Sequence, residues 1–175
     1  MPTTPEPRQL ERLESQLAAL RDGAVRLAEG YLQELDQVEP GHRASARNLL
    51  HYLSIRQHDI RALQEELAAL GLSSLGVLEP HALASLNAVI GILERLTGKT
   101  SGETPEAPVD FQTGPQLLRD HTRALLGPDP RGRFVRIMVT MPSEAATNPQ
   151  LVQDLLVAGM DVMRINCAHD GPDAW

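Results

Sequence analysis

Two stretches near the end of the chain decide its fold, Arg136-Ile-Met-Val-Thr-Met-Pro-Ser143 and Ala158-Gly-Met-Asp-Val-Met-Arg-Ile-Asn-Cys-Ala-His169. The first predicts a buried strand over residues 134–140 that ends in a polar turn, and the second predicts another over residues 161–166. The second strand is apolar along its length, yet an arginine, an asparagine and a histidine gather where it ends. In α/β barrels the active site is built from polar groups at the carboxyl ends of the buried parallel strands.

A helix is expected between these two strands. Asn148-Pro149 supplies a suitable N-cap followed by proline at the first helical position, and Gly159 marks the helix end. The side expected to be buried carries Leu151, Leu155 and Leu156. Strand, helix and strand together predict one βαβ unit with parallel strands.

The first part of the chain is predicted to be helical. Apolar residues spaced by three and four over residues 10–38 predict a long helix that Pro40-Gly41 ends. A second helix is expected over about residues 44–70 and a third over residues 80–98, and short connections predict an antiparallel bundle. The apolar face expected on the second helix carries Leu49, Leu53, Ile60, Leu63, Leu67 and Leu70.

Composition changes divide the chain further. Residues 99–112 are polar with two prolines and predict a linker, and residues 113–132 predict a connecting helix and turn. The predicted organisation is therefore a helical bundle over 1–98, the linker, the connecting helix, and the βαβ unit over 133–175. The fold class is mainly α, with an α/β unit at its end.

Charge and composition exclude several function classes. The net charge is −7 and aromatic residues make up 3% of the chain, which argues against a nucleic-acid surface. No apolar run is long enough for a membrane span, and the first residues lack a signal-peptide pattern. The single cysteine, Cys167, fits a reducing compartment and is expected to be a small buried apolar residue. We expect a cytoplasmic protein. The apolar face of the first predicted helix could pack on another subunit, so a homo-oligomer stays an open alternative.

The βαβ unit resembles the start of the pyruvate kinase family over residues 133–175. The family's two strand regions read Thr-Lys-Ile-Val-Cys-Thr-Ile-Gly-Pro-Ala-Ser and Ala-Gly-Met-Asn-Val-Ala-Arg-Leu-Asn-Phe-Ser-His-Gly. The matching residues here are Arg136, Ile137, Thr140, Pro142, Ser143, Ala158, Gly159, Met160, Val162, Arg164, Asn166 and His169. The resemblance implies the first βαβ of a (β/α)₈ TIM barrel, incomplete in this chain. The preceding helices look like the helical extension found in a bacterial branch of such proteins.

The resemblance also implies an activity and a site. The family moves a phosphoryl group from phosphoenolpyruvate to ADP in glycolysis, giving pyruvate and ATP, with magnesium and usually potassium. Arg164 matches the arginine that contacts the transferring phosphoryl group. Asn166 matches a nucleotide-contacting residue whose side-chain oxygen helps to hold potassium, and His169 matches the histidine beside the nucleotide phosphates.

Departures from the family pattern limit what this chain can do. Ala168 replaces a potassium-binding serine, Asp170 replaces a glycine, and the glycine before Pro142 is absent. The family's catalytic lysine and magnesium-binding carboxylates fall after Trp175, and the only lysine here is Lys99. We therefore expect no catalytic residue within this chain and no activity from it alone.

Other interpretations stay open at this point. The chain could be a non-catalytic helical interaction or regulatory module with a vestigial barrel start, or a phosphate-binding regulator. Arg164 could pair with Asp161 or Asp170, and Asn166 could simply form a turn. In the helical part a polar cluster is expected to be solvated or hydrogen-bonded between helices, with metal binding by its two histidines a weaker possibility. The cluster comprises Arg43, Arg47, Asn48, His51, Arg56, His58, Asp59 and Arg61.

Overall fold

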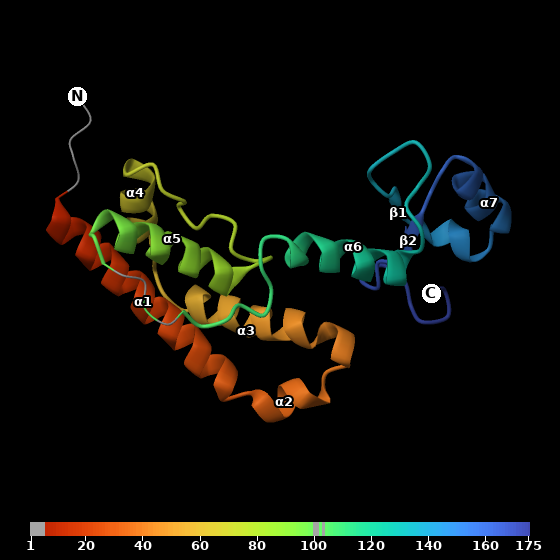
Figure 1. Cartoon of the computed structure of the whole chain (residues 1–175). Helices are drawn as coiled ribbons and strands as arrows, with labels where there is room; N and C mark the ends of the chain where they lie inside the picture. Colours follow the sequence, from red (N-terminus) through yellow and green to blue (C-terminus); the bar gives the residue numbers. More distant parts are fainter. Residues whose placement is uncertain (1–5, 100–101, 103) are drawn as a thin grey trace. The chain divides into compact units, whose positions relative to one another are not determined.

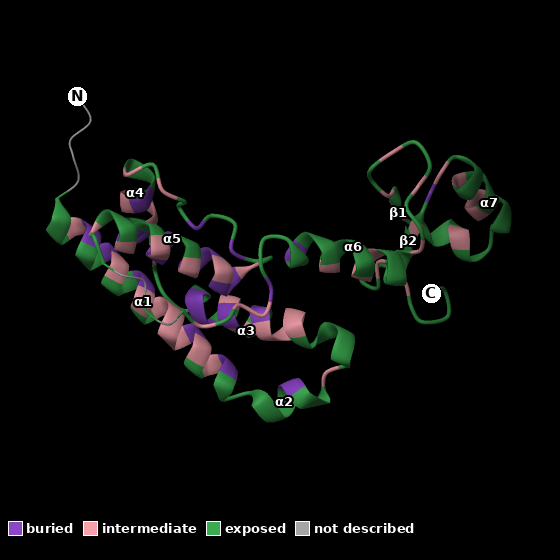
Figure 2. Ribbon diagram, in the orientation of Figure 1, coloured by how far each residue is buried: buried purple, intermediate pink, exposed green. Residues whose placement is uncertain are grey.

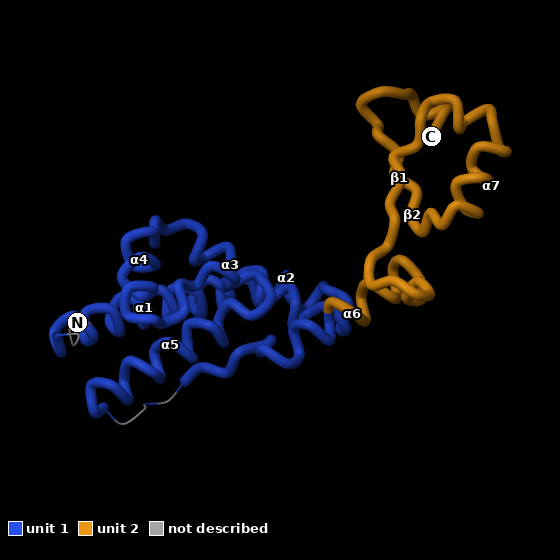
Figure 3. The backbone as a smooth tube through the Cα atoms, turned by 90° about the horizontal axis from the view of Figure 1, so that it is seen from above, with its two compact units in different colours: residues 1–117 blue, residues 118–175 orange. Residues whose placement is uncertain are grey.

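The structure is a computed structural model that describes residues 6–99, 102 and 104–175. The described residues form seven α-helices and one two-stranded parallel sheet, so the protein is mainly helical (Figure 1). The chain divides into two compact units, residues 1–117 and 118–175 (Figure 3). Among the described residues, no helix has the length and apolar character that a bilayer crossing requires.

The core of the first unit lies between three helices, α1 (Pro7–Glu29), α3 (Arg43–Arg56) and α5 (Ala82–Leu96), which all contact one another. Helix α1 runs antiparallel to the other two (Figure 1). Buried residues line the sides on which these helices face each other (Figure 2). The largest fully buried apolar side chains are Leu13, Leu17, Ile55, Leu67, Leu83, Leu86 and Leu93.

The long first helix is shorter than predicted. Helix α1 ends at Glu29, and a separate short helix, α2 (Leu32–Gln37), follows. The Gly30 amide donates to the carbonyl oxygens of both Arg26 and Leu27, at 3.2 and 3.1 Å, as at a helix end. Glycine disfavours helix interiors, so the break falls where the helix is weakest. A 3₁₀ turn, η1 (Pro40–His42), then ends the segment.

The single helix predicted over residues 44–70 is wrong, because two helices occupy this region. Helix α3 ends at Arg56, and α4 (Arg61–Ala69) begins after a turn. In that turn the Asp59 carboxylate accepts hydrogen bonds from the Arg61 amide at 3.2 Å and from its guanidinium at 2.9 and 2.6 Å. An aspartate side chain that satisfies a nearby amide competes with the helical hydrogen bond and favours a new helix start.

The apolar face predicted on α3 is also wrong. Leu49 and Leu53 are 53% and 47% exposed. Asn48 is buried instead; its Nδ2 donates to the Glu79 carbonyl at 2.7 Å, and its Oδ1 accepts from the Ala82 amide at 2.8 Å. Because the first amides of α5 need acceptors, a polar side chain suits this contact better than leucine does. The remaining buried residues of α3 are His51, Ser54 and Ile55.

The third predicted helix is confirmed as α5, and Gly98 follows it with a φ of +73°, which favours glycine. Just beyond, Lys99 Nζ forms an ion pair with Glu14 of α1 at 2.8 Å. Helix α6 (Thr113–Leu126) lies within the range predicted for the connecting helix and turn, and Gly127 follows it with a φ of +79°. Both helices therefore end where the sequence places a glycine.

The second unit contains β1 (Met138–Thr140), a 3₁₀ turn η2 (Ser143–Ala146), α7 (Pro149–Val157) and β2 (Val162–Arg164). The two strands are parallel, as predicted, and Thr140 lies opposite Arg164. The predicted helix cap is confirmed, because the Asn148 side chain accepts a hydrogen bond from the Leu151 amide at 3.2 Å.

Both strands are shorter than the predicted ranges 134–140 and 161–166, and neither is buried. Met138 is 57% exposed, and Leu156, expected on a buried side of α7, is 56% exposed. Within the described part of this unit only Met160 is buried. Two three-residue strands and one short helix present too little surface to cover each other's apolar side chains, which explains the difference.

Candidate functional site

The predicted phosphate-binding arginine lies at the carboxyl end of the small sheet. Arg164 Nη1 donates to Thr140 Oγ1 at 3.2 Å across the two strands, and both residues are exposed. Asp161 pairs with Arg133 rather than Arg164 and also accepts the Ile137 amide at 2.7 Å. These two donors hold the pKa of Asp161 below its usual range. None of the ion pairs among the described residues includes Arg164, so its guanidinium charge is uncompensated.

Asn166 and His169 lie in the turn that follows β2. The side-chain Oδ1 of Asn166 accepts a hydrogen bond from the Ala168 amide at 3.3 Å. The backbone carbonyl oxygen of Asn166 accepts one from the His169 amide at 3.1 Å. Asn166 therefore has the turn role that the sequence left open. An amide oxygen has two lone pairs, so one remains for another partner. The neighbouring Cys167 is exposed, which corrects the expectation that it is buried.

A cavity of about 330 Å³ lies beside this turn in the second unit. Its walls include Pro142 and Ser143 from the turn after β1, together with Asn166, Asp170 and Trp175. The volume is within the range of small-molecule sites. Arg164 and His169 do not line this cavity, so the structure brings Asn166 alone of the three predicted site residues to it.

The residues present do not complete either cation site that the family resemblance implies. Among the described residues, no three histidine, cysteine, aspartate or glutamate side chains are placed to hold a metal ion. One lone pair of Asn166 Oδ1 is already used by the turn, and the methyl group of Ala168 cannot ligate potassium.

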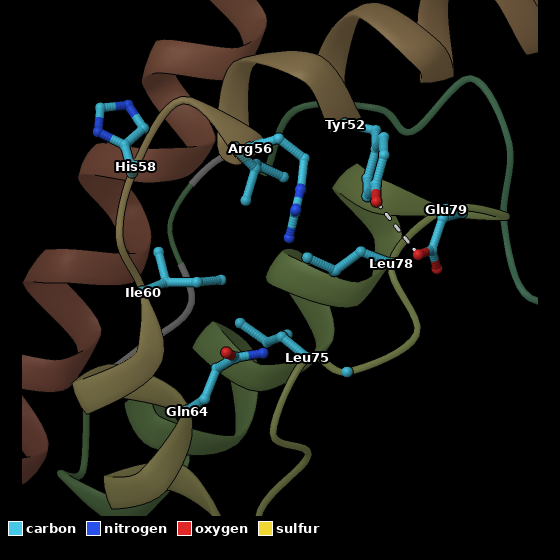
Figure 4. Close-up of a pocket in the computed structure, with 10 residues that line it drawn as sticks. Tyr52, Arg56, His58, Ile60, Gln64, Leu75, Leu78 and Glu79 are labelled. Carbon is cyan, nitrogen blue, oxygen red and sulfur yellow. Dashed lines mark hydrogen bonds between the residues drawn. The ribbon is translucent and has the colours of Figure 1, made fainter.

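A pocket in the first unit is too small for a nucleotide. It encloses about 80 Å³, room for a few water molecules only, between α3 and the segment that leads to α5 (Figure 4). Tyr52 donates its hydroxyl to Glu79 at 3.2 Å across one side. Figure 4 shows the Arg56 side chain reaching inward, whereas the His58 ring points away from Arg56 and Tyr52. This pocket therefore offers no converging set of catalytic groups.

The two histidines of the helical cluster do not come together. His51 is 1% exposed on the inner side of α3, whereas His58 is exposed in the turn after it. Neither ring nitrogen of His51 has a hydrogen-bond partner among the described residues. Burial, and then the nearby Arg47 charge, lower the pKa of His51 to about 4. The sequence predicts that Arg47 and His51 belong to a solvated or inter-helix face. Their four-residue spacing, which puts both on one side of α3, is the one sequence signal that they lie close together.

Acidification is expected to destabilise the protein through His51. Its pKa in the folded state, about 4, lies below the ordinary 6.5, so the unfolded chain binds the proton more readily. The stabilising contribution is complete above the ordinary pKa and is lost as the pH falls towards 4. Urea unfolding is expected to show a loss of about 2 kcal/mol through this residue between pH 7 and about pH 4.5.

A His51→Leu variant is the control for this pH effect, because it removes the titrating ring. Asp59, whose pKa Arg61 lowers to about 2, gives up its stabilising effect only at lower pH, so the two windows separate. An equal loss of stability in the parent and the variant over this pH interval would show that His51 is not responsible.

No protein-family model, curated protein or solved structure matches the chain. The functional assignment therefore depends on the motif around β2 and on the positions of its side chains. Of these, the exposed Arg164 beside Thr140 has the clearest chemical character, since its guanidinium can bind an anion without displacing a carboxylate.

Proposed function

We propose that residues 133–175 are the first βαβ unit of a pyruvate-kinase-like (β/α)₈ barrel. In the complete protein, that barrel transfers a phosphoryl group from phosphoenolpyruvate to ADP. The observation that carries the proposal is the exposed guanidinium of Arg164, free of any described carboxylate, at the carboxyl end of a parallel strand. It lies within the motif Ala-Gly-Met-x-Val-x-Arg-x-Asn-x-x-His at residues 158–169. A planar guanidinium binds phosphate oxygens through two donors and neutralises their developing charge.

Exposed apolar surface supports the barrel. In a (β/α)₈ barrel, neighbouring strands and an outer ring of helices cover both faces of each strand. A βαβ unit without those neighbouring strands and helices exposes apolar side chains to solvent, as this unit does. The large exposed apolar residues of the second unit around the strands and α7 include Phe134, Val135, Ile137, Met138, Leu156, Val157, Met163 and Ile165.

Each site residue has a limited role in this proposal. Arg164 binds and orients the phosphoryl group, and the Thr140 hydroxyl fixes the direction of the guanidinium. His169 donates to a nucleotide phosphate, and Asn166 contacts the nucleotide with its remaining amide groups. Magnesium, which the family uses, would neutralise charge on the phosphate oxygens. The residues that would hold it, and the lysine, are expected from chain beyond Trp175, and the potassium site is weakened by Ala168.

The test is to read the coding sequence past Trp175 and assay its whole product. An in-frame barrel is expected, with a lysine and a Glu-x-x-Asp-like carboxylate pair. The purified product should form pyruvate from phosphoenolpyruvate only when ADP and magnesium are added. The 175-residue chain alone should show no turnover, and it is the matched control.

Two outcomes contradict the proposal. A stop codon after Trp175 would favour the helical interaction or regulatory module instead, as would a continuation unrelated to a barrel. ADP-dependent turnover by the 175-residue chain itself would show that catalysis does not need further strands.

A further inference from the structure

A second cavity, unrelated to the barrel motif, lies within the helical unit. It encloses about 440 Å³ between α1, α3, the start of α5 and the segment after α5, a volume typical of small-molecule sites. Four of its seven lining residues are apolar, Val25, Leu83, Pro105 and Pro108. The other three lining residues are Arg47, His51 and Glu106, all of them ionisable.

His51 is a buried polar side chain that lacks partners. Its ring is 1% exposed and lines the cavity, yet neither nitrogen meets a hydrogen-bond partner among the described residues. Most buried polar side-chain atoms in proteins are hydrogen-bonded, because an unmet donor or acceptor is costly. The neutral ring therefore has one N–H donor and one acceptor that no described residue uses.

Arg47 brings positive charge to the same wall. It lies one helical turn before His51, so the two side chains share one side of α3. Its Nε is buried without a partner, and the Arg47 side chain takes part in none of the ion pairs or hydrogen bonds found among the described residues. An unpaired guanidinium beside an unpaired imidazole N–H forms a set of donors suited to a carboxylate.

Glu106 limits the charge of the ligand. Glu106 is one of the lining residues and is exposed, so we place its negative charge at the solvent side of the site. A second negative charge on a ligand would be repelled there, which disfavours phosphate dianions relative to a singly charged acid. The four apolar wall residues in turn favour a ligand with a hydrocarbon body.

From this arrangement we infer that the helical unit binds a small monocarboxylate with an apolar body. The carboxylate accepts hydrogen bonds from Arg47 and His51, and the hydrocarbon part contacts Val25, Leu83 and the two prolines. This site is separate from the proposed phosphoryl-transfer function, because all of its residues lie in the first unit.

The test is a titration of the 175-residue chain with benzoate, followed by NMR of the His51 ring and by calorimetry. Benzyl alcohol has the same ring without the charge, and inorganic phosphate has the charge without the ring. Benzoate is expected to bind at least about tenfold more tightly than either and to shift the His51 ring signals. Equal binding of benzoate and benzyl alcohol, tighter binding of phosphate, or no shift with benzoate would overturn the inference.

Variants separate binding from folding. Arg47→Gln is expected to weaken benzoate binding by about tenfold or more, whereas Arg56→Gln, an exposed arginine on the same helix, should leave it unchanged. Glu106→Gln is expected to tighten binding by about threefold, since it removes a like charge at an exposed position. A misfolded variant cannot mimic this gain, so weaker or unchanged benzoate binding by Glu106→Gln would overturn the assigned role of Glu106.

Discussion

Replacing Arg164 by alanine is expected to lower pyruvate formation by the complete protein by about 10³-fold. Among the described residues the guanidinium makes one hydrogen bond, to Thr140 Oγ1 at 3.2 Å, so its other donors stay available to a phosphate. In the proposed function, alanine removes the charge that would balance the transferring group, while the exposed position makes loss of folding a minor effect. The measurement is the initial rate at saturating ADP with phosphoenolpyruvate varied.

Two further variants control the Arg164 result. Arg131→Ala removes an exposed arginine from the turn before β1 and should leave the rate unchanged. Arg164→Lys keeps the charge but loses the planar two-donor geometry, so it should recover only part of the activity. An unaffected rate in Arg164→Ala, or the same loss in Arg131→Ala, would refute the phosphate-binding role.

Replacing Asn48 by alanine is expected to lower the free energy of unfolding by about 3 kcal/mol. Asn48 is 6% exposed and joins two elements: it donates to the Glu79 carbonyl and accepts from the Ala82 amide at the start of α5. Alanine would leave the buried Ala82 amide and the part-buried Glu79 carbonyl without that partner. Urea unfolding followed by circular dichroism measures the change.

Leu49→Ala is the matched control, because the next residue on the same helix has the opposite character. The apolar spacing alone assigns Leu49 to the core, where loss of a leucine side chain costs about 2–5 kcal/mol. In the structure Leu49 is 53% exposed, so the substitution is expected to cost less than about 1 kcal/mol. A larger loss for Leu49→Ala than for Asn48→Ala would mean that α3 faces the other way.

The helices were predictable where capping residues and apolar spacing agree. Asn148 caps α7, and Gly98 and Gly127 follow α5 and α6, as their positions in the sequence predict. The spacing failed at α3, because its inner side is held by polar contacts. A buried asparagine that bonds a distant backbone looks, in sequence, the same as an exposed one. The break before α4 is not predictable from apolar spacing for a similar reason. The Asp59 carboxylate accepts hydrogen bonds from Arg61 that compete with the helical backbone bonds, and apolar spacing carries no information on such bonds.

Only part of the candidate site could be predicted from the sequence. The residues around β2 were found from the motif, and the parallel pairing that brings Thr140 beside Arg164 followed from the βαβ pattern. The Asn166 turn could be named only as one alternative, because it depends on the backbone path after β2. The cavity with Arg47 and His51 could not be foreseen, since its wall also needs residues more than fifty positions later in the chain.

The ion pair between Lys99 and Glu14 makes one position chemically unique. Lys99 is the only lysine, so an acylating reagent directed at amines finds a single side-chain target. Acylation would remove the positive charge and leave the Glu14 carboxylate, now 15% exposed, without its cation. A single covalent label would thus report on, and at the same time loosen, the junction between the end of α5 and α1.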